Sequence, residues 1–205
     1  MEQSLKRLDD GDFETLIALG MGYAEEAIKL DRTASAGWEA KRKLLILSGD
    51  KNQAIEIGQM AVKLRPNSFA LKWDLAMALN RMSFYADALP YLKNALRMHP
   101  GHSAKMLQTL AETELAVGEL ESALVTIEKV LKRRPDELRA RLIKIFINGS
   151  LDRWEEAEED VQFFLRLYPE FKFSEWLPSQ SLGGPLDPND WFIVLGRAGL
   201  ADRTN

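Results

Sequence analysis

Apolar and polar positions repeat along most of the chain with the period of an amphipathic helix. The stretch YADALPYLKNALRMHP (85–100) places Ala88 and Ala95 seven residues apart, and Pro100 follows five residues later. Residues seven apart lie on one helix face, two turns along, where small side chains let a neighbouring helix approach closely. Proline lacks an N–H and cannot continue a helix. The pattern therefore predicts a closely packed helix that stops before Pro100.

The same spacing of seven and then five residues occurs three more times. The copies are Ala54, Ala61 and Pro66; Ala123, Val130 and Pro135; and Ala157, Phe164 and Pro169. Four copies at a nearly constant period predict a repeat architecture. Each copy also follows an earlier apolar helical stretch and a turn, at 48–53, 81–86, 117–122 and 149–154. Each unit is thus predicted to be a hairpin of two helices.

These hairpins resemble the tetratricopeptide repeat (TPR) family. The resemblance covers 35–68, 69–102, 104–137 and 138–171, with Trp38 matching the family's first-helix tryptophan and Gly49 and Gly118 matching its turn glycine. It implies an all-α fold, a TPR-like α-α superhelix of stacked hairpins. The first helices depart from the family pattern at Lys41 and Lys144, where leucine is preferred, and at Arg42 and Ile145, where a small residue is preferred, so we expect a shifted register there.

Residues 1–34 resemble a degenerate N-terminal repeat or cap. Arg32 stands where the proline would be, and Gly11–Phe13 resembles the turn between two helices. Gly20 and Gly22 lower helix propensity between these points. We expect a cap or an irregular helical pair here, because terminal repeats are often atypical.

Residues 172–205 form a different tail. Three prolines and a double glycine between 173 and 188 predict a loop. Asp187 as N-cap and Pro188 at the first helical position then predict a C-terminal helix that ends at Gly199. Its apolar face, formed by Trp191, Val194 and Leu195, is expected to cap the last hairpin; folding into the binding groove and docking on a second copy are the alternatives.

The end of this tail resembles the ends of TPR regions in bacterial class III adenylate cyclases. The matching residues are Asp187, Pro188, Leu195, Arg197, Ala198, Gly199 and Leu200. The resemblance implies a bacterial source and a regulatory region of a cyclase-type signalling protein.

Charge and composition restrict the classes of partner. Net charge is −4, and residues 1–34 hold eight acidic against four basic residues, so a nucleic-acid partner is not expected. The chain has no cysteine, hence no disulfide and no cysteine-ligated metal. The start lacks a secretory signal and the apolar runs are short, so we expect a cytoplasmic protein without membrane insertion.

No catalytic motif is present, and we expect a protein that is not an enzyme and needs no cofactor. The two histidines, His99 and His102, flank a Pro-Gly turn without a third ligand, so no metal site is predicted. Residues 131–141 are basic and could bind phosphate or an acidic partner, but we expect Lys132–Arg134 to complement the dipole at the C-terminal end of a helix.

The family resemblance implies that first helices line a concave groove and carry the ligand-binding residues. In this chain the partner-binding candidates are Glu39, Lys43, Trp73, Asp74, Met77, Asn80, Arg81, Lys105, Gln108, Glu112, Arg139, Leu142 and Phe146. Trp73, Met77 and Phe146 would be apolar anchors among charges, although Trp73 and Phe146 could instead be core. The predicted function is a protein–protein interaction scaffold that binds a peptide or helix of a partner protein. A self-assembly module that forms homo-oligomers is the alternative.

Overall fold

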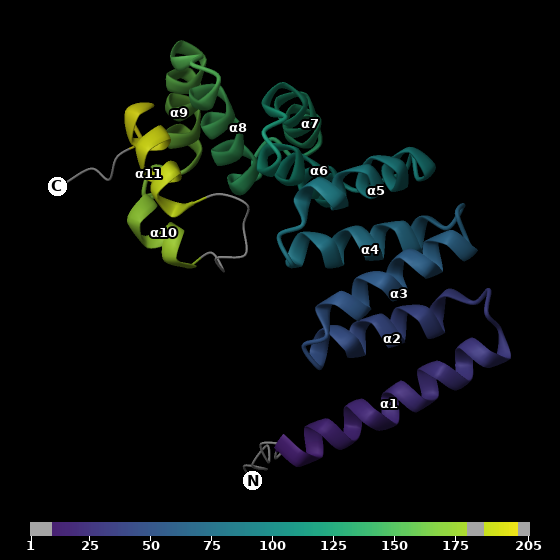
Figure 1. The fold of residues 1–205 in the computed structure, drawn as a ribbon. Helices are drawn as coiled ribbons and strands as arrows, with labels where there is room; N and C mark the ends of the chain where they lie inside the picture. The colour runs from purple at the N-terminus through teal and green to yellow at the C-terminus, as the bar shows by residue number, and fades with distance from the viewer. Residues whose placement is uncertain (1–9, 180–186, 201–205) are drawn as a thin grey trace, which may run out of the picture. The chain divides into compact units, whose positions relative to one another are not determined.

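The computed structural model describes residues 10–179 and 187–200, and within them all regular structure is helical (Figure 1). The elements are α1 (Asp10–Leu30), α2 (Ser35–Leu47), α3 (Lys51–Leu64), α4 (Phe69–Arg81), α5 (Tyr85–Met98), α6 (Ala104–Ala116), α7 (Leu120–Arg133), α8 (Leu138–Ser150), α9 (Trp154–Leu167), α10 (Phe173–Ser179) and α11 (Pro188–Arg197). The chain divides into two compact units, one ending at Met82 and the other beginning at Ser83. The boundary lies in the turn between α4 and α5, inside the predicted repeat 69–102.

Each hairpin turns at one residue with left-handed backbone geometry. The residues are Gly49 (φ +86°), Ser83 (φ +63°), Gly118 (φ +82°) and Asp152 (φ +57°). Glycine adopts this conformation without a steric penalty, whereas serine and aspartate adopt it at some cost. A turn of the same geometry therefore recurs in all four predicted repeats, although only two of them carry the glycine.

The small residues of the sequence pattern are packed as expected. Ala54, Ala61, Ala123 and Ala157 are each at most 2% exposed, because α2 packs on α3, α6 on α7 and α8 on α9. Side-chain caps start several helices: Asp50 accepts from the N–H of Gln53 at 3.0 Å. These local contacts hold each hairpin in the register that the spacing predicts.

In the first unit, α1 to α4 pack in chain order (Figure 1). Of the two expectations for 1–34, the irregular pair is wrong for the residues described, because α1 is one continuous helix from Asp10, and the cap stays a prediction. Gly11–Phe13 lies in its first turn and not in a loop. Gly20 sits where α2 comes close, since a Cβ there would be 3.1 Å from Leu44 Cδ1. Contact with α2 thus stabilises a helix whose glycines lower its intrinsic propensity.

In the second unit, α5 to α9 pack in chain order and α11 packs on α8. The tail begins with a helix, α10, where the prolines predicted a loop. Phe173 and Trp176 lie one turn apart on α10, and both face aromatic rings of α11. The ring centroids of Phe173 and Phe192 are 4.9 Å apart, and those of Trp176 and Trp191 are 6.0 Å apart. Burial of these rings outweighs the local turn signal. Residues 180–186 of the predicted loop lie outside the described residues.

The predicted C-terminal helix is confirmed. The side chain of Asp187 accepts from the N–H of Asn189 at 2.7 Å, and Gly199, with φ +94°, follows the end of α11. Trp191 and Leu195 are buried and Val194 is half-buried, so they form the apolar face that the sequence predicts.

Candidate partner-binding surfaces

The predicted binding residues lie on four first helices, two in each unit. In the first unit α2 contacts α4, and in the second α6 contacts α8. We call the two sets the α2–α4 surface and the α6–α8 surface. The α2–α4 surface contains Glu39, Lys43, Trp73, Asp74, Met77, Asn80 and Arg81; the α6–α8 surface contains Lys105, Gln108, Glu112 and Arg139.

An ion pair joins the two helices of the α2–α4 surface. Arg42 Nε donates to Asp74 Oδ2 at 2.8 Å, and Arg42 Nη2 also contacts that oxygen. The Arg42 side chain is 4% exposed and that of Asp74 is 23% exposed. Burial raises the pKa of Asp74, and the attraction of Arg42 opposes this only in part. The pair gives the surface a fixed, poorly solvated charge arrangement.

The same surface presents apolar side chains beside charged ones. Trp73 and Met77 are half-buried and lie one turn apart on α4, and Trp73 stacks on Phe69 with ring centroids 6.3 Å apart. Asn80 is half-buried and Arg81 is exposed on the next turn. On α2, the exposed Lys43 pairs with half-buried Glu39. Apolar anchors within a charged rim are typical of protein recognition surfaces.

A second polar network bridges α6 and α8. Arg139 Nε donates to Glu112 Oε1 at 2.7 Å, and Gln108 Nε2 donates to the same oxygen at 2.9 Å. Gln108 is buried, Glu112 and Arg139 are half-buried, and Lys105 is exposed. One carboxylate thus orients two donors on neighbouring first helices, which favours a preorganised polar surface.

Leu142 and Phe146 do not lie on an exposed surface. Leu142 is 0% and Phe146 5% exposed, and the ring centroids of Phe146 and Trp191 are 4.8 Å apart. Phe146 therefore belongs to the core, the alternative that the sequence left open. Its expected exposure is wrong because α11 packs on α8, a contact between residues far apart in the chain.

Arg42 is the residue that sequence reasoning did not include in the site. Its place in the hairpin is one where TPR proteins prefer a small residue. The space it needs comes from Gly58 on α3, where a Cβ would be 3.3 Å from Arg42 Cδ and 2.7 Å from Leu75 Cδ1. An arginine at a small-residue position, together with a glycine on the facing helix, is the signal that indicates a buried cation.

The lysines that depart from the family pattern are also paired. Lys41 Nζ is 2.7 Å from Glu25 Oε1, and Lys144 Nζ is 2.7 Å from Asp160 Oδ1. Asn148 Nδ2 donates to the other oxygen of Asp160 at 3.0 Å. Helices α2 and α8 pack on α3 and α9, and ion pairs accommodate these two lysines within the hairpins.

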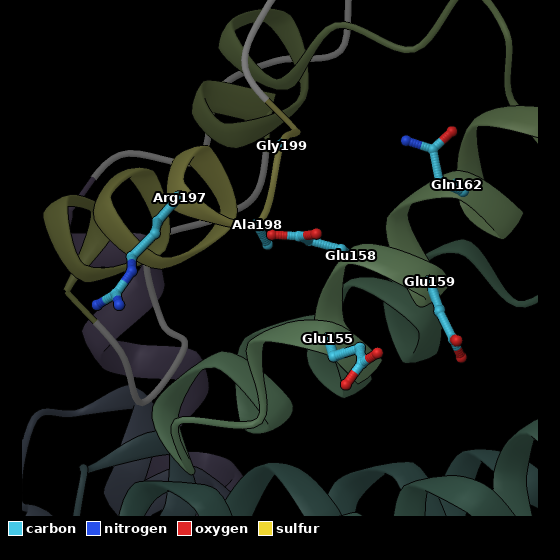
Figure 2. Close-up of a pocket in the computed structure, with 7 residues that line it drawn as sticks. All are labelled: Glu155, Glu158, Glu159, Gln162, Arg197, Ala198 and Gly199. Atoms are coloured by element: carbon cyan, nitrogen blue, oxygen red, sulfur yellow. The ribbon is translucent and has the colours of Figure 1, made fainter.

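An open hollow of about 450 Å³ is lined by α9 and by the end of α11. Figure 2 shows Glu155, Glu158 and Glu159 on α9, with Arg197 of α11 pointing away from them. The Arg197 guanidinium lies 3.7 Å from the centre of the Trp154 ring. Within residues 10–179 and 187–200 no group of three or more potential ligands could hold a metal ion. No described helix is both long and apolar enough to cross a membrane.

Comparison with known proteins agrees with this architecture. Residues 85–144 match the family model of the tetratricopeptide repeat. The chain is 25% identical over 148 residues to the CTR9 homolog of Arabidopsis thaliana, a match that spans 67% of this chain and 14% of that protein. The cyclase resemblance of residues 187–200 stays a prediction.

Two solved structures have a similar fold. YrrB, described as a TPR protein with an unusual peptide-binding site, is 17% identical with a TM-score of 0.65, and the match covers 76% of this chain and 80% of YrrB. MamA from Desulfovibrio magneticus RS-1 is 19% identical with a TM-score of 0.63, covering 80% of this chain and 98% of that structure. The fold predicted from the sequence is thus confirmed: this chain has the all-α, hairpin-solenoid fold of tetratricopeptide repeat proteins, and its residues 85–144 match the model of that family.

Proposed function

We propose that this chain is a non-enzymatic scaffold that binds a peptide or helix of a partner protein on its first helices. The observation that carries the proposal is the α2–α4 surface. Half-buried Trp73 and Met77 lie along one face of α4, beside the ion pair of Arg42 and Asp74. Aromatic and methionine side chains supply most of the contact energy at such surfaces, and surrounding charges select the partner.

The α6–α8 surface supports the same function with different chemistry. Its network of Gln108, Glu112 and Arg139 is polar, and Lys105 is exposed next to it. A partner that reaches this surface would meet hydrogen-bonding groups in place of apolar anchors. The peptide-binding site described for YrrB is a further reason to look for a peptide ligand on this fold.

The test is affinity capture from the source lysate with two matched double variants. Trp73→Ala/Met77→Ala removes the apolar anchors of the α2–α4 surface. Met60→Ala/Leu64→Ala is the control, since these side chains of α3 are 47% and 45% exposed and lie on a second helix of the same unit. Circular dichroism first establishes that both variants are folded.

A partner captured by wild type and by the control, but lost with Trp73→Ala/Met77→Ala, is the expected result. The loss in affinity should be on the order of tenfold or more, as for removal of buried anchors at an interface. A partner that both variants retain, or that both lose, would contradict binding at the α2–α4 surface.

A further inference from the structure

A second apolar surface lies on α1, apart from the proposed binding surfaces on the first helices. We call it the α1 stripe; its members and exposed fractions are Phe13 (42%), Leu16 (51%), Leu19 (54%), Tyr23 (65%) and Leu30 (83%). The residues are three, four or seven positions apart, so they follow one side of the helix. The side that packs on α2 includes the buried Ala24 and adjoins the stripe at Phe13, which lies eleven residues before Ala24 and points in nearly the same direction. The apolar surface of α1 thus extends beyond the part that α2 covers.

The repeat itself indicates what such a side accommodates. Three other second helices lie in the same compact unit as their first helix. There the first helix covers one side of the second: α2 covers α3, α6 covers α7, and α8 covers α9. Ala61, Val130 and Phe164 are therefore at most 2% exposed. Their counterpart in α1, five residues before Arg32, is Ala27, which is exposed. In this compact unit, the described residues include no helix before α1 that covers this side.

The α1 stripe is more apolar at Leu19 than the equivalent position of the other second helices, which is Gln53 in α3, Asp87 in α5, Ser122 in α7 and Glu156 in α9. Leu16 has no counterpart inside those helices, because each of them begins one residue later in the repeat. The additional apolar area favours a bound helix that lies over the whole length of α1.

Charges along the stripe indicate the chemistry of that helix. Asp12 is one turn before Leu16, and Glu26 lies one turn after Tyr23 and one turn before Leu30; both carboxylates are exposed. From Gly11 to Leu30 the only cation is Lys29, whereas the acidic residues are Asp12, Glu14, Glu26 and Glu25, the last of which pairs with Lys41 of α2. An antiparallel α1 from a second copy would bring these carboxylates together, which is unfavourable. Basic side chains on the partner would complement them.

We propose that the α1 stripe binds a basic amphipathic helix of a partner protein. The bound helix packs leucine-like side chains at i, i+3, i+4 and i+7 against Leu16, Leu19 and Tyr23. Its lysine or arginine side chains flank this seam and contact Asp12 and Glu26. This site is separate from the α2–α4 surface, so the two proposals can fail independently.

The experiment measures binding of a fluorescent leucine–lysine peptide of about 18 residues, roughly five helical turns, to the full chain by anisotropy. A leucine–glutamate peptide with the same apolar spacing is the first control. The test variant is Leu16→Gln/Leu19→Gln, and the charge variant is Asp12→Asn/Glu26→Gln. Met60→Gln/Leu64→Gln is the matched control because it removes exposed apolar side chains from α3.

The expected result is saturable binding of the basic peptide, weakened on the order of tenfold by Leu16→Gln/Leu19→Gln, as for loss of central anchors. Asp12→Asn/Glu26→Gln should weaken binding and reduce its salt dependence. The Met60→Gln/Leu64→Gln control and Trp73→Ala/Met77→Ala should bind as wild type does.

Three results would overturn the proposal: no binding by the wild-type chain, equal binding of the leucine–glutamate peptide, or unchanged binding by Leu16→Gln/Leu19→Gln. Sedimentation equilibrium without peptide tests whether a second copy of this chain binds to the stripe instead. If the wild type dimerises and Leu16→Gln/Leu19→Gln is a monomer, then the stripe binds a second copy and the proposed partner is wrong. The side chains substituted on α1 and α3 are exposed, so these variants should fold. Trp73 and Met77 are half-buried, and circular dichroism checks the folding of every variant.

Discussion

Arg42 on α2 and Asp74 on α4 form an ion pair that joins two first helices within one unit. The distance from Arg42 Nε to Asp74 Oδ2 is 2.8 Å, and the arginine is nearly fully buried. Gly58 on α3 leaves the room for this side chain. A cation at a small-residue position is therefore part of the packing, and its removal has a measurable cost.

Alanine substitution of either member of this pair should destabilise the first unit. Removal of one partner leaves a buried or half-buried charge without its counterion, so we expect each of Arg42→Ala and Asp74→Ala to lower the free energy of unfolding by about 2 kcal/mol. The double variant should cost less than the sum of the two. Urea denaturation measures all three. Lys43→Ala, which breaks the more exposed pair with Glu39, is the control and should cost no more than about 0.5 kcal/mol. If the costs of Arg42→Ala and Asp74→Ala add up in the double variant, the two residues are not coupled and the prediction is wrong.

The contribution of Asp74 to stability should depend on pH. Because burial raises its pKa, the folded protein binds a proton on Asp74 more readily than the unfolded chain does. The associated stability is fully present below the ordinary carboxyl pKa of about 3.9 and is lost as pH rises through the raised value. The free energy of unfolding of wild type minus that of Asp74→Asn should therefore fall as the pH rises through this range. A difference that rises with pH would show that Arg42 lowers the pKa instead.

Two glycines of α1 should respond differently to alanine. No atom lies within 4 Å of a Cβ built on Gly22, so Gly22→Ala should stabilise the protein by up to about 1 kcal/mol through helix propensity. At Gly20 the new methyl group would be 3.1 Å from Leu44 Cδ1, and the packing must adjust. Gly20→Ala should therefore give a smaller gain or a loss. Thermal unfolding of both variants checks the order, and an equal gain would mean that α1 and α2 are packed less closely than described.

Gly149 controls how closely α11 approaches α8. A Cβ at Gly149 would be 2.5 Å from Val194 Cγ1 and 3.1 Å from Trp154 Cζ3, so Gly149→Ala should destabilise this packing by about 1–3 kcal/mol. Gly196→Ala is the matched control within α11, since a Cβ there meets no atom within 4 Å. Limited proteolysis should release C-terminal fragments faster from Gly149→Ala. Equal rates for wild type and Gly149→Ala would contradict the close contact.

Trp191 should account for much of the docking energy of α11. It is 7% exposed and its ring contacts those of Phe146 and Trp176, so Trp191→Ala should lower the free energy of unfolding by about 3–5 kcal/mol. Ile193→Ala, on the same helix but 67% exposed, should have little effect. Urea denaturation compares them. Similar costs for both variants would show that α11 docks on another side.

Local pattern was sufficient to predict the hairpins. The spacing that places Ala54 and Ala61 on one face, followed by Pro66, depends only on helix geometry and on the missing N–H of proline. The cap at Asp187 and the end of α11 near Gly199 were predictable for the same reason. Such signals act between residues a few positions apart, and they hold whatever the rest of the chain does.

Contacts between residues far apart in the chain determined the remaining features. Phe146 has the spacing of an exposed first-helix residue and is buried because Trp191, 45 positions later, packs on it. Phe173 and Trp176 lie in a helix, despite nearby prolines, because aromatic rings from α11 surround them. Arg42 is buried because Gly58 leaves room and Asp74 supplies a counter-charge. Burial and charge pairing are properties of the assembled helices, so a pattern read along one helix cannot specify them.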